Sequence, residues 1–289
     1  MIALAWIPWN VALEAGAVVG SVGLAAGVTQ RRRFAPVISF TRELTLVLVL
    51  YAFWRLIGMI SVLKVDGAID AGQRIWDVER ALHLPSEHGL QHLFMKSSVL
   101  IQACNVYYAT MHFPAMLALL VWMWVRHREK YPEVRNVVAL TTLGCLAIQL
   151  IPVAPPRLVP ALHVADTPAL FGQTVYPAFG RSGPAQLSAM PSVHVAWAVI
   201  VAVVVVMAST SRWRWLVLAH PIATTIVVVV TGNHYWLDGV VAVMVLALAV
   251  VLERGSRRAI DRLRAPRWTP VPAAASADAR LAPAREPVS

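Results

Sequence analysis

The sequence has 289 residues, of which 58% are hydrophobic and only 14% are charged. A soluble globular chain carries about 25% charged residues, so this composition excludes an ordinary soluble protein and indicates several membrane spans. The formal net charge is +10, but the Lys and Arg residues lie in short segments between apolar runs. We therefore expect them to set membrane orientation, and we expect no nucleic-acid partner.

Seven apolar segments are long enough to be membrane spans, which need about 20 residues each. They are residues 8–29, 43–63, 107–125, 136–153, 191–209, 214–231 and 237–253. No alternating strand pattern is sustained, and only helices or closed barrels satisfy their backbone groups in lipid. The sequence therefore predicts an all-α, polytopic transmembrane helix bundle with about seven spans.

The distribution of basic residues predicts the orientation of these spans. On one side of them lie 18 of the 25 Lys and Arg residues, and 6 lie on the other side. The positive-inside rule then places segments 64–106, 154–190 and 232–236 outside the cytoplasm, and the C-terminus inside. We expect an integral protein of the plasma membrane.

Composition also divides the chain. We expect a first membrane span in residues 1–29 and a membrane-embedded main domain in residues 30–264. Residues 265–289 are rich in Pro, Ala and Arg, which predicts a disordered, basic, cytoplasmic tail able to touch anionic lipids.

One amphipathic segment does not span. Residues 68–95 predict a helix along the outer membrane interface, or else a solvated loop helix. Its apolar and polar residues would form opposite faces: Ile75, Val78, Leu82 and Leu84 against Arg74, Asp77, Glu79 and Arg80.

Three polar clusters in residues 150–253 lie on the predicted outer side. "IPVAPPRLVP" contains Arg157, "SAMPSVH" contains Ser192 and His194, and "TGNHYWLDG" contains His234 and Asp238. Because all three follow or precede apolar spans at the same face, we expect them to converge on one site.

The histidines and the aspartate suit phosphate ester chemistry. His234 and Asp238 are four residues apart, so on a continuous helix the carboxylate can hold one ring nitrogen and leave the other as a base or nucleophile. His194 would be a separate, protonated imidazole that donates to a leaving alkoxide. Two His and one Asp could instead bind a metal, but no third His or Cys stands at ligand spacing, so we expect no metal and no cofactor.

The neighbouring residues suit phosphate binding. Pro191 fits the first position of a helix, which would leave the amides around Ser192 and Val193 unpaired and ready to receive phosphate oxygens. Arg157 would supply a planar, permanently charged fork for the same oxygens.

These motifs resemble those of a known family. "PSVH" and "HYWLD", whose histidines are 40 residues apart, are similar to the second and third signatures of the type-2 phosphatidic acid phosphatase superfamily, which shares its fold with vanadium haloperoxidases. The resemblance covers roughly residues 136–253. It implies a six-helix core and a lipid phosphate or pyrophosphate substrate. It also implies that His234 forms a phosphohistidine, that Asp238 orients it and that His194 protonates the leaving group.

Two positions depart from the usual phosphatase pattern. The family's first-motif lysine corresponds to Leu150 and its third-motif arginine to Val228. The pattern "APPR…MPSVH…NHYWLD" is more similar to the inositol phosphorylceramide synthase branch, which implies a phospholipid headgroup transferase as an alternative. Further pocket residues are expected near this site: Tyr107, Tyr108, His112, Asn233 and Tyr235.

A membrane transporter is a third hypothesis from another class. It rests on the bundle itself and on Glu14 and Arg55 as charges within spans. Arg55 could equally pair with Glu43, extend to the interface or reach a lipid phosphate.

Overall fold

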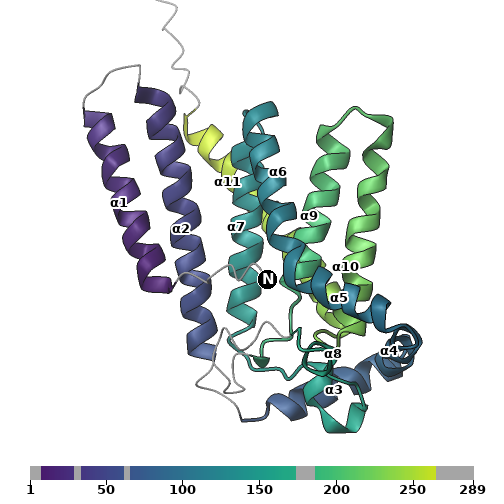
Figure 1. Ribbon diagram of the computed structural model, residues 1–289. Helices are drawn as coiled ribbons and strands as arrows, with labels where there is room; N and C mark the ends of the chain where they lie inside the picture. Colours follow the sequence, from purple (N-terminus) through teal and green to yellow (C-terminus); the bar gives the residue numbers. More distant parts are fainter. Residues whose placement is uncertain (1–7, 29–33, 62–65, 174–185, 265–289) are drawn as a thin grey trace, which may run out of the picture. The chain divides into compact units, whose positions relative to one another are not determined.

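The computed structural model describes residues 8–28, 34–61, 66–173 and 186–264 (Figure 1). These residues form helices joined by irregular segments, and their β-structure is limited to an isolated bridge between Val153 and Ser188. The all-α prediction is confirmed. The chain divides into two units at Glu253 and Arg254. The predicted disordered tail, residues 265–289, lies outside the described part of the chain.

Eleven α-helices lie in the described residues. They are α1 (Trp9–Val28), α2 (Ala35–Ser61), α3 (Ala68–Ala81), α4 (Glu87–Met95), α5 (Ser98–Thr110), α6 (His112–Arg126), α7 (Tyr131–Ile148), α8 (Thr167–Leu170), α9 (Val193–Ala208), α10 (Ala219–Val230) and α11 (Trp236–Arg264). Short 3-10 turns occur at Pro156–Leu158, Pro160–Leu162 and Arg212–Leu218.

The structure supports fewer spans than the seven predicted. Among the described residues, four helical segments are long and apolar enough to cross a membrane: Trp9–Val28, Ala35–Phe53, Arg212–Val230 and Trp236–Leu263. The bent pair α5–α6 would make a fifth. Two predicted spans fall short, since α9 has 16 residues and α7 begins with the polar residues Glu133, Arg135 and Asn136. The protein is thus an integral membrane protein, and its described residues provide four or five clear spans.

The third predicted span is broken. Helices α5 and α6 meet at Met111 with a bend of 47°. Pro114 has no backbone N–H to donate to the preceding turn, which explains a break at this point. The bend lies between Tyr107 and His112, two of the residues expected to line the pocket.

The predicted interfacial helix of residues 68–95 is two helices, α3 and α4, separated at Pro85. Ser86 caps α4 by accepting a hydrogen bond from the Gly89 amide at 3.2 Å. The predicted division into apolar and polar faces is partly wrong: Glu79 is fully buried, whereas Val78 and Leu82 are exposed. The reason is a contact between Glu79 and α11, described below.

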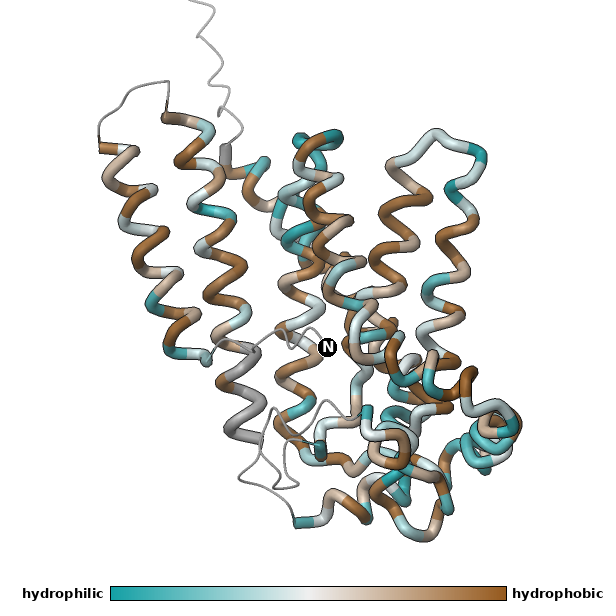
Figure 2. Tube along the Cα trace, viewed as in Figure 1, coloured by the Kyte–Doolittle hydropathy of each residue, from teal (hydrophilic) through white to brown (hydrophobic). Residues whose placement is uncertain are grey.

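Helix α9 is central to the packing. It contacts α6, α7 and α10, and small buried residues such as Ala196, Ala198 and Ala202 allow these close approaches. Trp197 donates to Thr142 of α7 at 3.0 Å. Figure 2 shows the apolar character of α9 and α10, and more polar residues in the segments between helices.

Helices α1 and α2 pack against each other, and α2 also contacts α7. The contact with α7 is polar: Arg135 donates to both carboxylate oxygens of Glu43, at 2.5 and 2.7 Å, and Tyr131 donates to the same group. Glu43 therefore has Arg135 as a partner, which removes the need for a pairing with Arg55. The side chain of Arg55 lies outside what the structure describes.

Candidate active site

Backbone hydrogen bonds join the three motif segments. The first and second pair through Val153, whose amide donates to Leu187 O at 2.7 Å and whose carbonyl accepts from the Ala189 amide at 3.2 Å. The Arg157 amide donates to Gly232 O at 3.1 Å, which joins the first segment to the third. The Ser192 amide donates to Asp238 O at 3.2 Å and joins the second to the third. The predicted convergence is therefore present in the structure.

Gly232 makes this arrangement possible. Its φ is +71°, a left-handed conformation that glycine adopts without strain. A Cβ atom there would lie 3.0 Å from Arg157 Cβ and 3.0 Å from Val164 Cγ1. The turn between α10 and α11 thus needs glycine both for its conformation and for the close approach of Arg157.

The ring of His234 is fixed by two acceptors. Its Nδ1 lies 2.7 Å from the carbonyl oxygen of Ala189 and 3.1 Å from Asp238 Oδ2. A carbonyl oxygen can only accept, so Nδ1 carries a proton, and in the neutral ring Nε2 is then the nitrogen with the lone pair. This is the tautomer that a nucleophilic histidine requires.

The spacing of His234 and Asp238 predicted that both lie on one continuous helix, and this prediction is wrong. Helix α11 begins at Trp236, so His234 precedes it and Asp238 lies in its first turn. The buried carboxylate reaches back along the chain, where Oδ2 also accepts from the Tyr235 amide at 2.9 Å. Asp238 therefore caps the start of α11 and orients His234 with the same oxygen.

His194 lies beside His234 within a group of rings. The His194 and His234 ring centroids are 5.6 Å apart, a separation that allows both rings to flank one phosphorus atom. Tyr108 stacks on His194 at 4.5 Å, and His112 meets it edge-on at 4.3 Å. His194 Nδ1 is buried and has no hydrogen-bond partner among the described residues.

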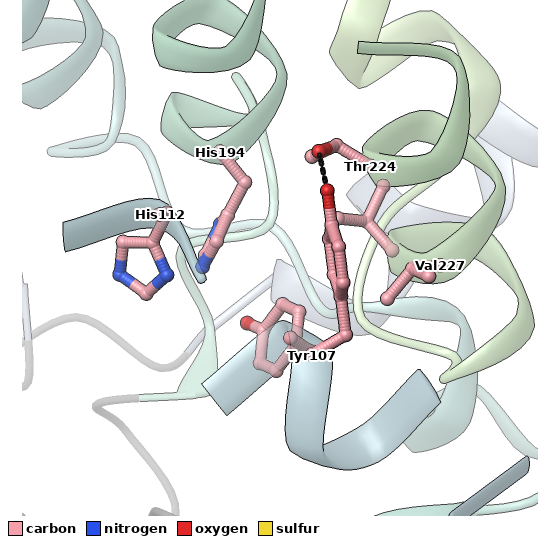
Figure 3. A pocket seen from close by; sticks show the side chains of 7 residues that line it. Tyr107, His112, His194, Thr224 and Val227 are labelled. Carbon is pink, nitrogen blue, oxygen red and sulfur yellow. Dashed lines mark hydrogen bonds between the residues drawn. The ribbon is translucent and has the colours of Figure 1, made fainter. Parts of the chain in front are cut away.

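A narrow cavity borders His194 (Figure 3). Its volume is about 10 Å³, which is room for about one water molecule. Tyr107 contributes a polar wall, because its hydroxyl bonds to Thr224 at 3.0 Å and to the His220 ring at 2.7 Å. The cavity is lined by Tyr107, Tyr108, His112, His194, Thr224, Val227 and Val228.

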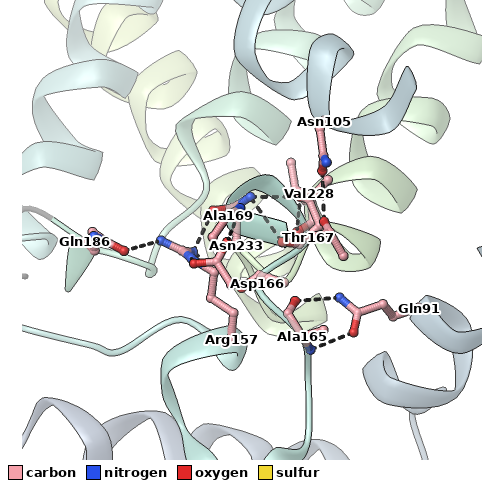
Figure 4. Close-up of polar contacts among 12 residues, drawn as sticks. Gln91, Asn105, Arg157, Ala165, Asp166, Thr167, Ala169, Gln186, Val228 and Asn233 are labelled. Carbon is pink, nitrogen blue, oxygen red and sulfur yellow. Dashed lines mark hydrogen bonds and ion pairs between the residues drawn. The ribbon is translucent and has the colours of Figure 1, made fainter. Parts of the chain in front are cut away.

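Arg157 is buried and held by several partners (Figure 4). It donates to Asn233 Oδ1 at 2.6 Å and to Gln186 Oε1 at 3.0 Å, and its Nε lies 3.4 Å from Asp166. Asn233 precedes His234 in the chain, so this bond ties the guanidinium to the histidine's segment. Asp166 offsets part of the positive charge that a phosphate would meet.

The predicted free amides are only partly present. Helix α9 begins at Val193, with Ser192 as its N-cap and Pro191 outside the helix, not at its first position. The Ser192 amide is not unpaired, since it donates to Asp238 O. The Ser192 hydroxyl accepts from the Val195 amide at 3.4 Å. Val193 is the first helical residue, where no carbonyl within the helix can accept from the amide.

Tyr235, the remaining pocket candidate, has a structural role. Its side chain is buried, and its hydroxyl donates to Ala154 O at 3.0 Å. This bond joins the first and third motif segments, and Tyr235 does not line the cavity beside His194.

Comparison with known proteins now identifies the family. A model of the PAP2 superfamily, the type-2 phosphatidic acid phosphatases, matches residues 73–252. The chain belongs to the PAP2 superfamily. No curated protein and no solved structure gave a match. Membership of the PAP2 superfamily supports a membrane enzyme of the phosphatase or phosphotransferase type, and the match contains all three motif segments.

The described residues contain no group of three or more His, Cys, Asp or Glu side chains arranged to hold a metal ion. His194 contacts aromatic rings, and His234 Nδ1 is occupied by Ala189 and Asp238. The candidate site brings together two imidazoles and one carboxylate.

The groups that support these residues carry little signal in the sequence. Ala189 acts through its backbone carbonyl, so its side chain carries no signal. Gln186 and Asp166 lie 29 and 9 residues from Arg157, and no fixed spacing marks them as its partners. The amphipathic pattern places Glu79 on the polar face of the interfacial helix, although an acidic residue in a membrane chain is itself a reason to look for a buried partner.

Proposed function

We propose that the protein is an integral membrane phosphoesterase that hydrolyses a lipid phosphate or pyrophosphate through a phosphohistidine intermediate. The observation that carries this proposal is the fixed ring of His234, whose Nδ1 bonds to Ala189 O and Asp238, so that in the neutral ring Nε2 is the nitrogen able to attack phosphorus. The second imidazole, His194, lies 5.6 Å away between ring centroids.

The first chemical step forms a nitrogen–phosphorus bond. His234 Nε2 attacks phosphorus, the bond from phosphorus to the lipid oxygen breaks, and protonated His194 gives its proton to that oxygen. Asp238 stabilises the positive charge that develops on the His234 ring. The products are a phosphohistidine and a neutral lipid alcohol, or a lipid phosphate when the substrate is a pyrophosphate.

The second step releases phosphate. Neutral His194 takes a proton from water, the water oxygen attacks phosphorus, and the bond to His234 Nε2 breaks. The cavity beside His194 has room for about one water molecule, which supports this role. We assign phosphate binding to Arg157, the Ser192 hydroxyl and the Val193 amide, with Asn233 positioning Arg157.

The substrate is a lipid on the extracytoplasmic side of the plasma membrane in this proposal. The excess of Lys and Arg on the opposite side of the spans supports that orientation, with the C-terminus in the cytoplasm. A lipid headgroup reaches His194 only if the surrounding Tyr108 and His112 side chains move, because the cavity is narrow.

The test is phosphate release by the purified protein in detergent micelles. Phosphatidic acid and polyprenyl phosphates and pyrophosphates are the substrates to compare. We expect wild type to release phosphate from at least one of them and His234→Ala to release none, while the exposed-residue control His92→Ala keeps the wild-type rate. Equal rates for wild type and His234→Ala on every substrate would reject the proposal.

A second candidate is a phospholipid headgroup transferase using the same site. Val228, at the position of the family's third-motif cation, is an apolar wall of the cavity beside His194, which favours an acceptor with apolar surface. Leu150, at the first-motif position, is also uncharged. Labelled phosphatidylinositol with a hydroxylated lipid or glycan acceptor separates the two: label on the acceptor supports transfer, and label released only to water supports hydrolysis.

A further inference from the structure

Two carboxyl groups that belong to none of the three motifs are fully buried next to the start of α11. Glu79 lies in α3 and Glu87 in the first turn of α4, and each residue has a relative exposure of 0%. Acidic residues are almost never fully buried without partners. Their contacts therefore indicate what they do.

Glu79 binds the helix that carries Asp238. Its Oε1 accepts from the Leu237 amide at 2.7 Å. Leu237 lies in the first turn of α11, where the amides have no carbonyl partner within the helix. The indole of Trp236 donates to Pro85 O at 2.9 Å, so the corner between α3 and α4 holds two consecutive residues directly before Asp238.

Helix α3 comes close to this segment because Gly72 has no side chain. A Cβ on Gly72 would lie 2.6 Å from the Tyr235 hydroxyl and 2.7 Å from Ala154 O. The contact between α3 and residues 235–238 is therefore a close fit, and Glu79 is on the buried side of it.

Each of the two carboxyl groups has one buried oxygen without a hydrogen-bond partner among the described residues, Glu79 Oε2 and Glu87 Oε1. Two such carboxyl groups can satisfy each other only if one of them holds a proton, because ionised carboxylates only accept. Arg80 Nη2 lies 3.3 Å from Glu87 Oε2, so it balances the charge of Glu87 while Glu79 is neutral.

The charges around Glu79 favour this protonated state. Burial is the main cause, and with the neighbouring carboxyl group of Glu87 and the charge of Asp238 it raises the pKa of Glu79 from 4.5 to about 9. The Leu237 amide acts in the opposite direction. Arg80 faces Glu87 from α3, and His234 faces Asp238.

We infer that Glu79 is a positioning residue, and that the Glu79–Glu87 pair, holding one proton, fixes the first turn of α11 and with it Asp238 and His234. This inference rests on the proposed function. When the proton is lost, two buried carboxylates and Asp238 repel one another within the same region. The first turn of α11 then loosens, Asp238 no longer holds His234 Nδ1, and the rate falls.

The test is the pH dependence of kcat and KM between about pH 6 and pH 10, in wild type, Glu79→Gln and Glu79→Ala. The amide of glutamine can accept from Leu237 and donate to Glu87 without a titrating proton. We expect Glu79→Gln to keep most of the neutral-pH rate and to lose the alkaline fall near pH 9. Glu79→Ala should lower kcat by about tenfold or more at every pH, with little change in KM, because it removes the contact with Leu237.

An exposed carboxylate on the same helix provides the matched control. Asp70 lies in α3 and is exposed, so the variant Asp70→Asn should keep the wild-type pH dependence of kcat and KM. The inference would be overturned if the rate of Glu79→Gln fell near pH 9 as in wild type, or if folded Glu79→Ala had the same kcat as wild type.

Hydrogen exchange of the peptide that contains Leu237 separates this inference from the proposed function. Wild type should exchange faster above about pH 9, after correction for the intrinsic pH dependence of exchange, and Glu79→Gln should not. This readout needs no substrate. If His234→Ala retains activity but the exchange result holds, the proposed function fails while the positioning role of Glu79 stands. Equal exchange in wild type and Glu79→Gln above about pH 9 would reject the positioning role.

Discussion

The carbonyl oxygen of Ala189 lies 2.7 Å from His234 Nδ1, closer than Asp238 Oδ2 at 3.1 Å. A backbone carbonyl thus shares with Asp238 the task of holding the histidine proton on Nδ1. The second motif segment supplies this carbonyl three residues before Ser192, so the segment that presents His194 also orients His234.

Asp238→Asn should lower kcat by roughly 10³- to 10⁴-fold, as expected when a histidine loses the carboxylate that stabilises its correct tautomer and its positive charge. The Ala189 carbonyl still holds Nδ1, so a residual rate should remain above that of His234→Ala. Steady-state phosphate release measures both. Asp77→Asn, an exposed carboxylate of α3, is the control, and an Asp238→Asn rate within about threefold of wild type would contradict the assignment.

His194→Asn should affect substrates according to their leaving groups. A general acid is needed for a lipid alkoxide but hardly for a stabilised phenolate, so the rate on a lipid phosphate should fall by about 10²- to 10⁴-fold and that on an aryl phosphate far less. Formation of the phosphoenzyme from the aryl phosphate, followed in a rapid-quench experiment, is the relevant rate. Equal losses on both substrates would show that His194 does not protonate the leaving group.

A chelator should leave the activity unchanged. The proposed steps use side chains alone, and the described residues hold no group of ligands arranged for a metal ion. Phosphate release is measured before and after dialysis against EDTA, with added Zn²⁺ or Mg²⁺ as the reverse experiment. Loss of activity on chelation that returns with one of these ions would favour the metal-binding alternative.

Long apolar runs and the charges between them were sufficient to predict the helical class and the convergence of the motifs. Apolar runs can be recognised from sequence because lipid leaves the backbone few other solutions. The motif residues could be predicted as a group because polar side chains next to membrane spans are expensive without a function. The structure then joined them through Val153, Arg157 and Ser192.

Other features depend on contacts between distant segments and could not be predicted. Glu79 appears polar and solvated in a helical pattern, yet it is buried because the Leu237 amide, 158 residues away, needs an acceptor. His234 and Asp238 do not share a helix because α11 begins at Trp236. The ends of helices are the feature that a sequence predicts least well. The bend at Met111 is different, because it follows from the nearby Pro114 and was predictable from the sequence.

Gly232→Ala should destabilise the protein by about 1–3 kcal/mol, because alanine is strained at a φ of +71° and its Cβ would crowd Arg157 and Val164. The apparent Tm in detergent should fall. Gly27→Ala is a suitable control, since Gly27 lies in α1 with no atom within 4 Å of its Cβ position, and alanine in a helix is neutral or slightly stabilising. Equal Tm values for the two variants would contradict the strain argument.

The thermal stability should also depend on pH through Glu79. The pKa of this carboxyl is raised from 4.5 to about 9 in the folded protein, so the folded state keeps a proton that the unfolded state releases. The contribution is therefore fully present below about pH 4.5 and is lost as pH rises to about 9, at no more than about 1.4 kcal/mol per pH unit. Glu79→Gln cannot titrate, so its apparent Tm should exceed that of wild type by a margin that widens from about pH 6 to about pH 9. Parallel Tm curves for the two proteins would show that Glu79 does not hold the proton.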